Sequence, residues 1–263
     1  MRYCLAALAA LFAIGVLFSS NCPAIDHGSI VGIWLFDEGS GDEINDTSGN
    51  GNDGIVVGAT WTDGVFGSAL EFDGTNHAEV PASNGIDDIM DGFTYMIWAM
   101  PTAPPLDANN TRLMERDWHN PTIQIGAADF YGSIAVGADQ ANTHVRGGAW
   151  EQGEWSFVAL TYDGDVIKLY VDGEMVGEKA VGKPDEDSHS ATPEDQQGAI
   201  WFAQWKAGAG WSFTGALDEA AVFNVPLSEE DIQDIMNNGL EKIAAVSSLG
   251  KLSVTWGYVK NVR

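Results

Sequence analysis

Oxygen-bearing side chains crowd one short glycine-rich stretch, residues 46–54, which reads DTSGNGNDG. Calcium binds six to eight hard oxygens from carboxylates, amide carbonyls, backbone carbonyls and water. A glycine-rich loop bends tightly enough to direct several such oxygens at one point, so Asp46, Asn50 and Asp53 are candidate calcium ligands. The alternative is structural, because Asp and Asn side chains also cap turns by hydrogen bonding to nearby backbone. The loop is not an EF-hand, since the twelve-residue ligand spacing and its final Glu are missing.

Tryptophan is the second residue type that could bind a ligand, and the chain has ten of them. Trp34, Trp98 and Trp155 lie within strand-like patterns and are expected in the core. Others lie in loops or at strand ends, where an aromatic ring could stack on a sugar ring while polar groups bind its hydroxyls. The predicted ligand-binding residues are Trp118, Arg116, His119, Trp205 and Trp211. Arg112 and Glu115 could add to the polar rim, and the alternative is that these aromatics pack beneath the loops.

The charge balance excludes several classes of partner. The chain has 38 acidic and 12 basic residues, for a formal net charge of −26. A protein that binds nucleic acid carries a basic surface for the phosphate backbone, and an anionic membrane surface repels so acidic a chain. We therefore expect no nucleic-acid partner and no membrane insertion after the leader is removed. Solubility in a salty exterior explains the charge most simply, and specific cation capture is the alternative.

The N-terminal segment has the layout of a secretory signal peptide. Arg2 supplies a positive charge, residues 3–18 form an uncharged apolar run, and Ala24 closes a stretch suited to cleavage. The apolar run is short for a membrane span, which needs about 20 residues. A retained anchor and a lipoprotein attached through Cys22 are the alternatives. Because Cys4 and Cys22 both belong to or adjoin this leader, we expect an exported protein, secreted or in the cell envelope, without disulfides.

After the leader, short apolar runs recur between turn residues, which is typical of strands. Asp-Gly pairs at 163–164 and 172–173 separate three of these runs and favour tight hairpin turns. Ser228 is the expected N-cap of one helix at 228–238, with acidic residues in its first turn. The expected strands cover residues 30–36, 93–100, 122–126, 131–136, 155–162, 166–171, 175–181, 199–204 and 213–223. We therefore predict an all-β fold, a two-sheet antiparallel jelly-roll sandwich with one short helix near the C-terminus.

The chain is expected to form one domain behind its leader. Residues 1–24 are the predicted signal peptide, residues 25–240 the jelly-roll domain and residues 241–263 a C-terminal extension that carries four of the 12 basic residues. A polar and acidic stretch at 183–197 is expected to form a surface loop.

Six segments then follow one another in a recognisable order. They read IVGIWLFDEGSGD (30–42), DTSGNGNDGI (46–55), GSALEFDGT (67–75), WSFVALTYDGD (155–165), KLYVDGEMVGE (168–178) and FTGALDEAAVFNVPLSEEDI (213–232). Their order and spacing over residues 29–239 resemble the laminin G-like jelly-roll domains of secreted bacterial proteins, within the concanavalin A-like lectin and glucanase superfamily.

The resemblance implies two antiparallel sheets with the first and last strands close together. It implies a binding or adhesion module, often for sugars or protein partners. It also implies a structural calcium at a sheet edge, for which Asp218 in the last strand would be a distant ligand that joins Asp46, Asn50 and Asp53. A fold of this kind hosts many functions, so the identity of the ligand stays open.

Catalysis would need a pair of carboxylates. Retaining glycosidases of the resembled superfamily carry them in a Glu-x-Asp-x-x-Glu string, with the carboxyl groups about 5–5.5 Å apart, and this sequence has no such string. Asp218 and Glu219 are adjacent and are expected on opposite faces of a strand. We therefore expect an exported, non-catalytic module that binds carbohydrate or a protein partner and is stabilised by calcium. The alternatives are a glycoside hydrolase on the same fold and a structural or adhesive envelope protein.

Overall fold

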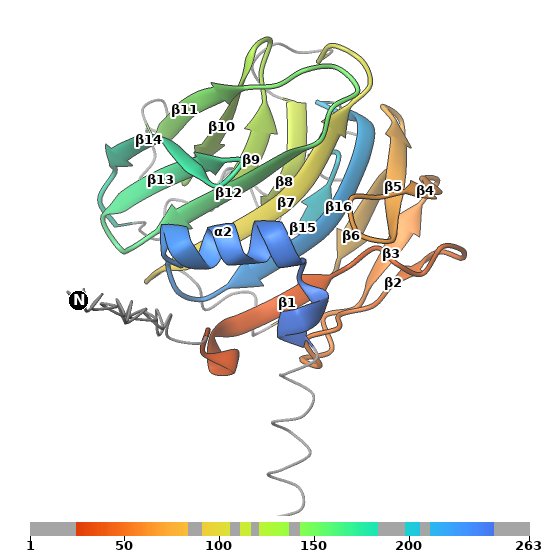
Figure 1. Cartoon of the computed structure of the whole chain (residues 1–263), viewed down its shortest axis with the longest axis horizontal. Coiled ribbons are helices and arrows are strands. Elements are labelled where there is room, and N and C mark those ends of the chain that lie inside the picture. The colour runs from red at the N-terminus through yellow and green to blue at the C-terminus, as the bar shows by residue number, and fades with distance from the viewer. Residues whose placement is uncertain are drawn as a thin grey trace, which may run out of the picture.

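Antiparallel strands form nearly all of the regular structure (Figure 1). The computed structural model describes residues 25–83, 91–105, 111–116, 121–136, 143–183, 198–205 and 211–244. The predicted signal peptide, most of the predicted loop at 183–197 and most of the predicted C-terminal extension lie outside these residues. Within the described part of the chain, no helix has both the length and the apolar character to cross a membrane.

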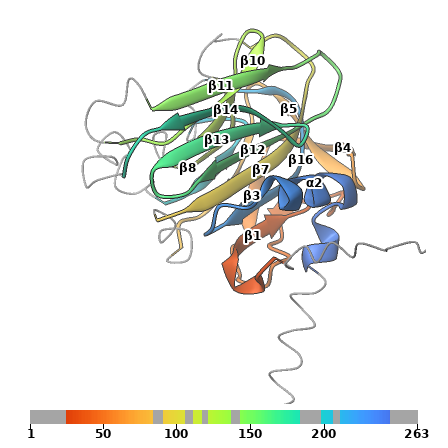
Figure 2. The same ribbon diagram turned by 60° about the vertical axis from the view of Figure 1, so that its left-hand side comes forward.

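Two sheets of eight strands each lie face to face (Figures 1 and 2). Sheet I runs in the order β14-β13-β12-β7-β16-β5-β4, and β1 also pairs with β16. Its strands are β1 (Ile30–Trp34), β4 (Thr60–Asp63), β5 (Ser68–Asp73), β7 (Phe93–Pro101), β12 (Ser156–Tyr162), β13 (Val166–Val171), β14 (Glu174–Ala180) and β16 (Thr214–Phe223). The pairing of β1 with β16 confirms that the first and last strands are neighbours.

Sheet II runs in the order β11-β10-β9-β8-β15-β6-β3-β2. Its strands are β2 (Glu43–Ile44), β3 (Gly54–Val57), β6 (His77–Val80), β8 (Thr111–Arg116), β9 (Thr122–Ile125), β10 (Asp129–Ser133), β11 (His144–Ala149) and β15 (Ile200–Phe202). The all-β, two-sheet sandwich predicted from the sequence is therefore confirmed.

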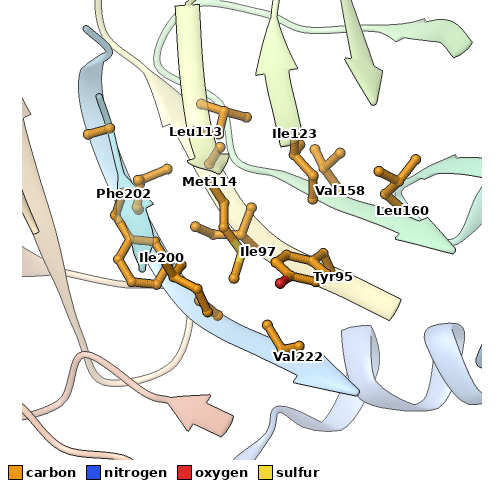
Figure 3. Close-up of a cluster of buried hydrophobic side chains, with 14 of the residues drawn as sticks. Tyr95, Ile97, Leu113, Met114, Ile123, Val158, Leu160, Ile200, Phe202 and Val222 are labelled. Carbon is orange, nitrogen blue, oxygen red and sulfur yellow. The ribbon is translucent and has the colours of Figure 1, made fainter. Parts of the chain in front are cut away.

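The main core fills the space between the inner faces of the two sheets. Successive residues of a strand point to opposite faces, so Tyr95, Ile97 and Leu160 enter the core from sheet I. Ile123 and Phe202 enter from sheet II and meet them, as Figure 3 shows. All five side chains have no exposed surface. Burial of each such side chain stabilises the fold by about 1.5–3 kcal/mol, so this layer holds the sheets together.

A second core lies on the outer face of sheet I, beneath helix α2 (Glu229–Asn238) (Figure 1). Ile232 and Ile235 are buried there against sheet residues such as Phe157. Ser228 caps the helix as predicted, because its hydroxyl accepts from the Asp231 N–H while the Asp231 carboxylate accepts from the Ser228 N–H. Helix α2 and this second core cover part of the outer face of sheet I. The outer face of sheet II carries no such core among the described residues.

Strands β2 to β6, β8 and β11 were not among those expected from the sequence, and β8 matters most for the site. Its residues do not alternate cleanly, because an irregularity in its pairing with β9 between Arg112 and Met114 places both Leu113 and Met114 in the core. Arg112 and Glu115 were expected beside a loop, but they belong to a central strand of sheet II. This correction matters, because a strand fixes the direction of each side chain.

Candidate functional site

A row of cross-strand neighbours on the outer face of sheet II consists, apart from Ile55, of polar and aromatic side chains. Strand pairing places Glu115 on β8 beside Trp201 on β15, and Trp201 beside Glu79 on β6. In full, the row reads Glu43, Ile55, Glu79, Trp201, Glu115, Thr122, Ser133 and His144, from β2 to β11. The two ends of the row are exposed, whereas Trp201 through Ser133 are buried. Polar groups are therefore buried at the centre of a face that carries no second hydrophobic core among the described residues.

A second row lies beside the first and contains a buried ion pair. Arg112, Gln124, Tyr131 and Arg146 are successive cross-strand neighbours on β8, β9, β10 and β11. The Arg112 guanidinium donates through Nε to the Glu115 carboxylate. Its Nη1 donates to Gln124 Oε1 at 2.5 Å. Arg112 and Glu115 have no exposed surface, so their charges are taken out of water together and the ion pair offsets part of that cost.

Two of the predicted ligand-binding tryptophans come together beside this ion pair. The rings of Trp205 and Trp211 have centroids 4.8 Å apart at an interplanar angle of 35°. The centroid of the Trp211 ring lies 5.2 Å from the Arg112 guanidinium carbon, a cation–π arrangement. The backbone carbonyl of Trp211 also accepts from the backbone N–H of Arg112, at 2.9 Å. Both tryptophans are half-buried. The structure therefore places Trp205 and Trp211 side by side, with Arg112 against Trp211. Ligand binding by the two tryptophans stays a prediction.

The other predicted ligand-binding residues are Arg116, Trp118 and His119, and the structure does not place them beside this pair. Arg116 pairs in register with Ile200, an inward-facing core residue, so it lies on the other face of β8 from Glu115. Arg116 is buried there and is not brought to the Trp205–Trp211 pair. Trp118 and His119 lie outside the described residues. Trp201, which the sequence patterns placed in a strand and not in a site, lies in the centre of the outer row.

The environment of Trp201 favours neutral groups. Its ring lies 5.3 Å from the ring of His77, whose Nε2 is 3.8 Å from a Glu79 carboxylate oxygen. Burial lowers the pKa of His77 and raises the pKa of Glu79. Loss of hydration disfavours the charged form of both groups, as expected beside a large aromatic surface. This part of the face therefore combines an aromatic plane with an imidazole and a carboxyl group whose charged forms are disfavoured by burial.

The predicted calcium ligands of the glycine-rich loop are engaged by backbone. Asp46 Oδ1 accepts from the N–H groups of Ile33 at 3.1 Å and Ser48 at 2.9 Å, and its Oδ2 accepts from the Asn52 N–H at 3.0 Å. Asp53 Oδ1 accepts from the Asp46 N–H at 2.8 Å. The bond from Ser48 is the Asx turn that was the structural alternative to a metal ligand.

The amides of the same loop bind the edge of β1 that faces away from β16. Asn50 Nδ2 donates to the Ile30 carbonyl at 2.7 Å and to the Val31 carbonyl at 3.2 Å. Asn52 Nδ2 also donates to the Val31 carbonyl, at 2.8 Å. Thr47 donates its N–H to the Ile33 carbonyl at 2.9 Å. Loop 46–52 thus supplies β1 with partners that a strand would otherwise provide.

Asp218 serves a different part of the fold. Its Oδ2 accepts from the N–H groups of Val65 at 2.8 Å and Phe66 at 3.1 Å, in the turn between β4 and β5. The register of β16 with β7 shifts between Asp218 and Ala221, and Glu219 has a φ of 45° there. Glu219 accepts from the Leu240 N–H at 2.6 Å, just beyond helix α2. Both carboxylates are buried, and desolvation raises the pKa of each to about 7.

The four predicted metal ligands are therefore not gathered into one donor set by the contacts described. Asp46, Asn50 and Asp53 organise loop 46–52, whereas Asp218 holds the β4–β5 turn. Within the described ranges, no group of three or more His, Cys, Asp or Glu side chains is arranged to hold a metal ion. Calcium binding stays a prediction, and no step below depends on it.

Comparison with known proteins agrees with this architecture. The chain is similar to domain 4 of AbnA, an extracellular GH43 arabinanase from Geobacillus stearothermophilus solved with arabinotriose, at 16% identity and a TM-score of 0.56, over 79% of this chain and 98% of that one. The binding domain of Paraclostridial Mosquitocidal Protein 1 gives 15% identity and a TM-score of 0.61, over 80% of this chain and 52% of that one. Trypanosoma rangeli sialidase, solved with 2,3-difluorosialic acid, gives 17% identity and a TM-score of 0.57, over 80% of this chain and 33% of that one.

The chain thus spans nearly all of the arabinanase domain but about half of the toxin binding domain and a third of the sialidase. At these identities the similarity concerns the fold. A search of curated proteins finds no match. The family model described as "Concanavalin A-like lectin/glucanases superfamily" matches residues 72–233, more than half of the chain, so the protein belongs to that laminin G-like family.

Proposed function

We propose that this protein is an exported, non-catalytic module that binds a glycan on the outer face of sheet II. The observation that carries the proposal is the Trp205–Trp211 pair packed against the Arg112–Glu115–Gln124 network. Aromatic planes stack on the apolar faces of sugar rings. The network itself is buried, so its part in the proposal is to hold the Trp211 ring in position through Arg112.

The position of these groups on strands supports the proposal. Arg112, Glu115 and Gln124 lie on β8 and β9 in the middle of sheet II, where strand pairing fixes the direction of each side chain. A binding site gains precision when its groups are held by regular structure and by each other. Domain 4 of the arabinanase, whose length this chain matches almost entirely, was solved with a sugar oligomer. That similarity makes oligosaccharides the first ligands to test.

The test is a glycan array followed by titration calorimetry on the best ligand. Trp205→Ala and Trp211→Ala are each expected to weaken binding about tenfold or more, because aromatic side chains dominate such contacts. Trp61→Ala is the matched control, since Trp61 lies on β4 of sheet I, half-buried and bonded to the Gly41 carbonyl at 3.1 Å. Equal affinities for the three variants would refute this location. Repeating the titration with calcium and then with chelator tests the calcium prediction separately.

A glycoside hydrolase is the second candidate, and one observation favours it. Glu79 and Glu115 flank Trp201 on the same face, two strand spacings apart, which corresponds to roughly 9–10 Å between backbones. Inverting glycosidases hold their two carboxyl groups about 6.5–9.5 Å apart. Release of reducing ends from a bound oligosaccharide, abolished in Glu79→Gln, would establish this function in place of simple binding.

A further inference from the structure

Strand β4 ends sheet I on one side, and one of its two edges has no neighbouring strand (Figure 1). The N–H of Gly64 donates to the Gly67 carbonyl at 3.0 Å in the turn that joins β4 to β5, and this bond sets the order of the hydrogen bonds between the two strands. Because bonded and non-bonded pairs alternate along antiparallel strands, the backbone groups of Trp61 and Asp63 point away from β5. Within the described residues, no other backbone segment bonds to these groups. Strand β4 therefore presents an open edge.

The two faces of this open edge differ in polarity. The Trp61 side chain packs against the main core and is only half-buried. Thr60 and Thr62 lie on the opposite face of β4, because successive residues of a strand alternate. A segment that extends sheet I here therefore needs apolar side chains beside Trp61 and small polar side chains beside the two threonines.

The surface around the open edge is acidic. Residues 60–73, which form β4, the turn and β5, include Asp63, Glu71 and Asp73 but no Lys, Arg or His. All three carboxylates are exposed, and Glu71 lies directly across from Thr60 on β4. A surface with one sign of charge attracts segments of the opposite sign and excludes segments of its own. The segment that fits this edge is therefore basic.

The C-terminal part of the chain has both of these properties. Residues 252–256 read LSVTW, an alternation of apolar side chains with Ser and Thr that is typical of a strand. Residues 245–263 carry Lys251, Lys260 and Arg263 and no acidic residue. The composition of this segment thus complements the polarity and the charge of the β4 edge.

The chain leaves helix α2 beside the same part of sheet I. A side-chain carbon at Gly239, just beyond α2, would lie 3.4 Å from Cδ1 of Phe66, in the turn between β4 and β5. The described residues continue for about one helical turn to Ala244. From there an extended chain spans up to about 23–25 Å before Lys251, whereas β4 itself is about 13 Å long. The basic segment can therefore reach the open edge of β4.

From these observations we infer that residues 251–256 bind the open edge of β4 as a further strand of sheet I. Leu252, Val254 and Trp256 then lie beside Trp61, between the two sheets, and the small polar residues between them lie beside the threonines of β4. The occupant is a segment of the same molecule, so it occupies an edge that another copy could otherwise extend. The inference is independent of the ligand proposed for sheet II.

The test is residue-resolved amide hydrogen exchange by NMR on the intact chain. The N–H groups of Trp61 and Asp63 are expected to exchange at least about tenfold more slowly than unpaired exposed amides, because the added strand accepts from them. Val254→Asn should remove this protection, since it places an amide side chain on the apolar face. Ser253→Asn is the matched control, because it makes a neutral polar change on the opposite face and should keep the protection. The N–H of Thr62, which bonds to β5, reports in every variant whether sheet I itself stays folded.

Two further measurements separate the possible occupants of the edge. Lys251→Glu reverses a charge next to an acidic surface and should reduce the protection of Trp61 and Asp63, more at low salt than at high salt. Protection that rises with protein concentration would assign the edge to a second copy and overturn the inference. Rapid exchange of both amides in the wild-type protein, or equal effects of Val254→Asn and Ser253→Asn, would overturn it as well.

Discussion

Asp46 should be one of the most costly loop residues to replace, whether or not calcium binds. Its carboxylate accepts three backbone N–H groups and is 8% exposed. A hydrogen bond to a charged group contributes about 1.5–3 kcal/mol, and such terms do not add fully. We therefore expect Asp46→Ala to lower the free energy of unfolding by about 3–4 kcal/mol. In a domain of this size that corresponds to a fall of roughly 6–16 °C in Tm.

The measurement is urea unfolding followed by tryptophan fluorescence, in chelator throughout. Asp73→Ala is the matched control, because Asp73 accepts from Thr75 in an exposed turn and its loss should cost less than about 1 kcal/mol. The reasoning fails if Asp46→Ala and wild type unfold at the same urea concentration in chelator. If they differ only when calcium is added, the residue acts through the metal and not through the three backbone bonds.

Three further changes test other parts of the fold. Desolvation raises the pKa of Asp218 from 3.8 to about 7, so the folded carboxyl holds its proton more tightly than the unfolded one. Its contribution to stability is thus complete below about pH 4 and is lost as the pH rises through about 7. Asp218→Asn should flatten the stability profile over this range and gain about 2 kcal/mol at pH 8 relative to wild type, measured by urea unfolding at each pH; an unchanged profile would contradict the raised pKa. Gly132→Ala should destabilise the protein by about 1–3 kcal/mol, because the new Cβ would lie 2.3 Å from Leu160 Cδ1 across the core, and a variant as stable as wild type in urea would show that the sheets can separate locally. Ser228→Ala should cost about 1 kcal/mol by removing the N-cap of α2, with a matching fall in Tm, whereas no fall would mean that packing alone holds the helix.

The fold class could be predicted from local patterns, although strands β2 to β6, β8 and β11 were not among those expected. The Asp-Gly pairs separate β12, β13 and β14 as expected, and Ser228 begins the helix. Strand β8 was missed because two consecutive core residues, Leu113 and Met114, break the alternation that identifies a strand. Pairing irregularities depend on partner strands distant in sequence, so a local pattern does not reveal them.

The candidate site was predicted in part. Trp205 and Trp211 were chosen for their residue type and position, and the structure brings them together. Arg116 was chosen over Arg112, although only Arg112 faces the aromatic pair. The pairing irregularity decides which face of β8 each side chain occupies. Because β8 was not recognised as a strand, the sequence could not show that Arg112 and Arg116 lie on opposite faces. Asp218 and Glu219 were expected to lie on opposite faces of a regular strand. The register of β16 with β7 shifts between Asp218 and Ala221, so simple alternation does not hold there.

The contacts of loop 46–52 also bear on how the molecule behaves in concentrated solution. An uncovered strand edge presents free N–H and C=O groups that can pair with the strands of another molecule and start aggregation. Because Asn50, Asn52 and Thr47 already bind the β1 carbonyls, another molecule cannot extend sheet I along that edge without first displacing them. The polar composition of this loop therefore guards the protein against self-association at the place where its sheet would otherwise be open.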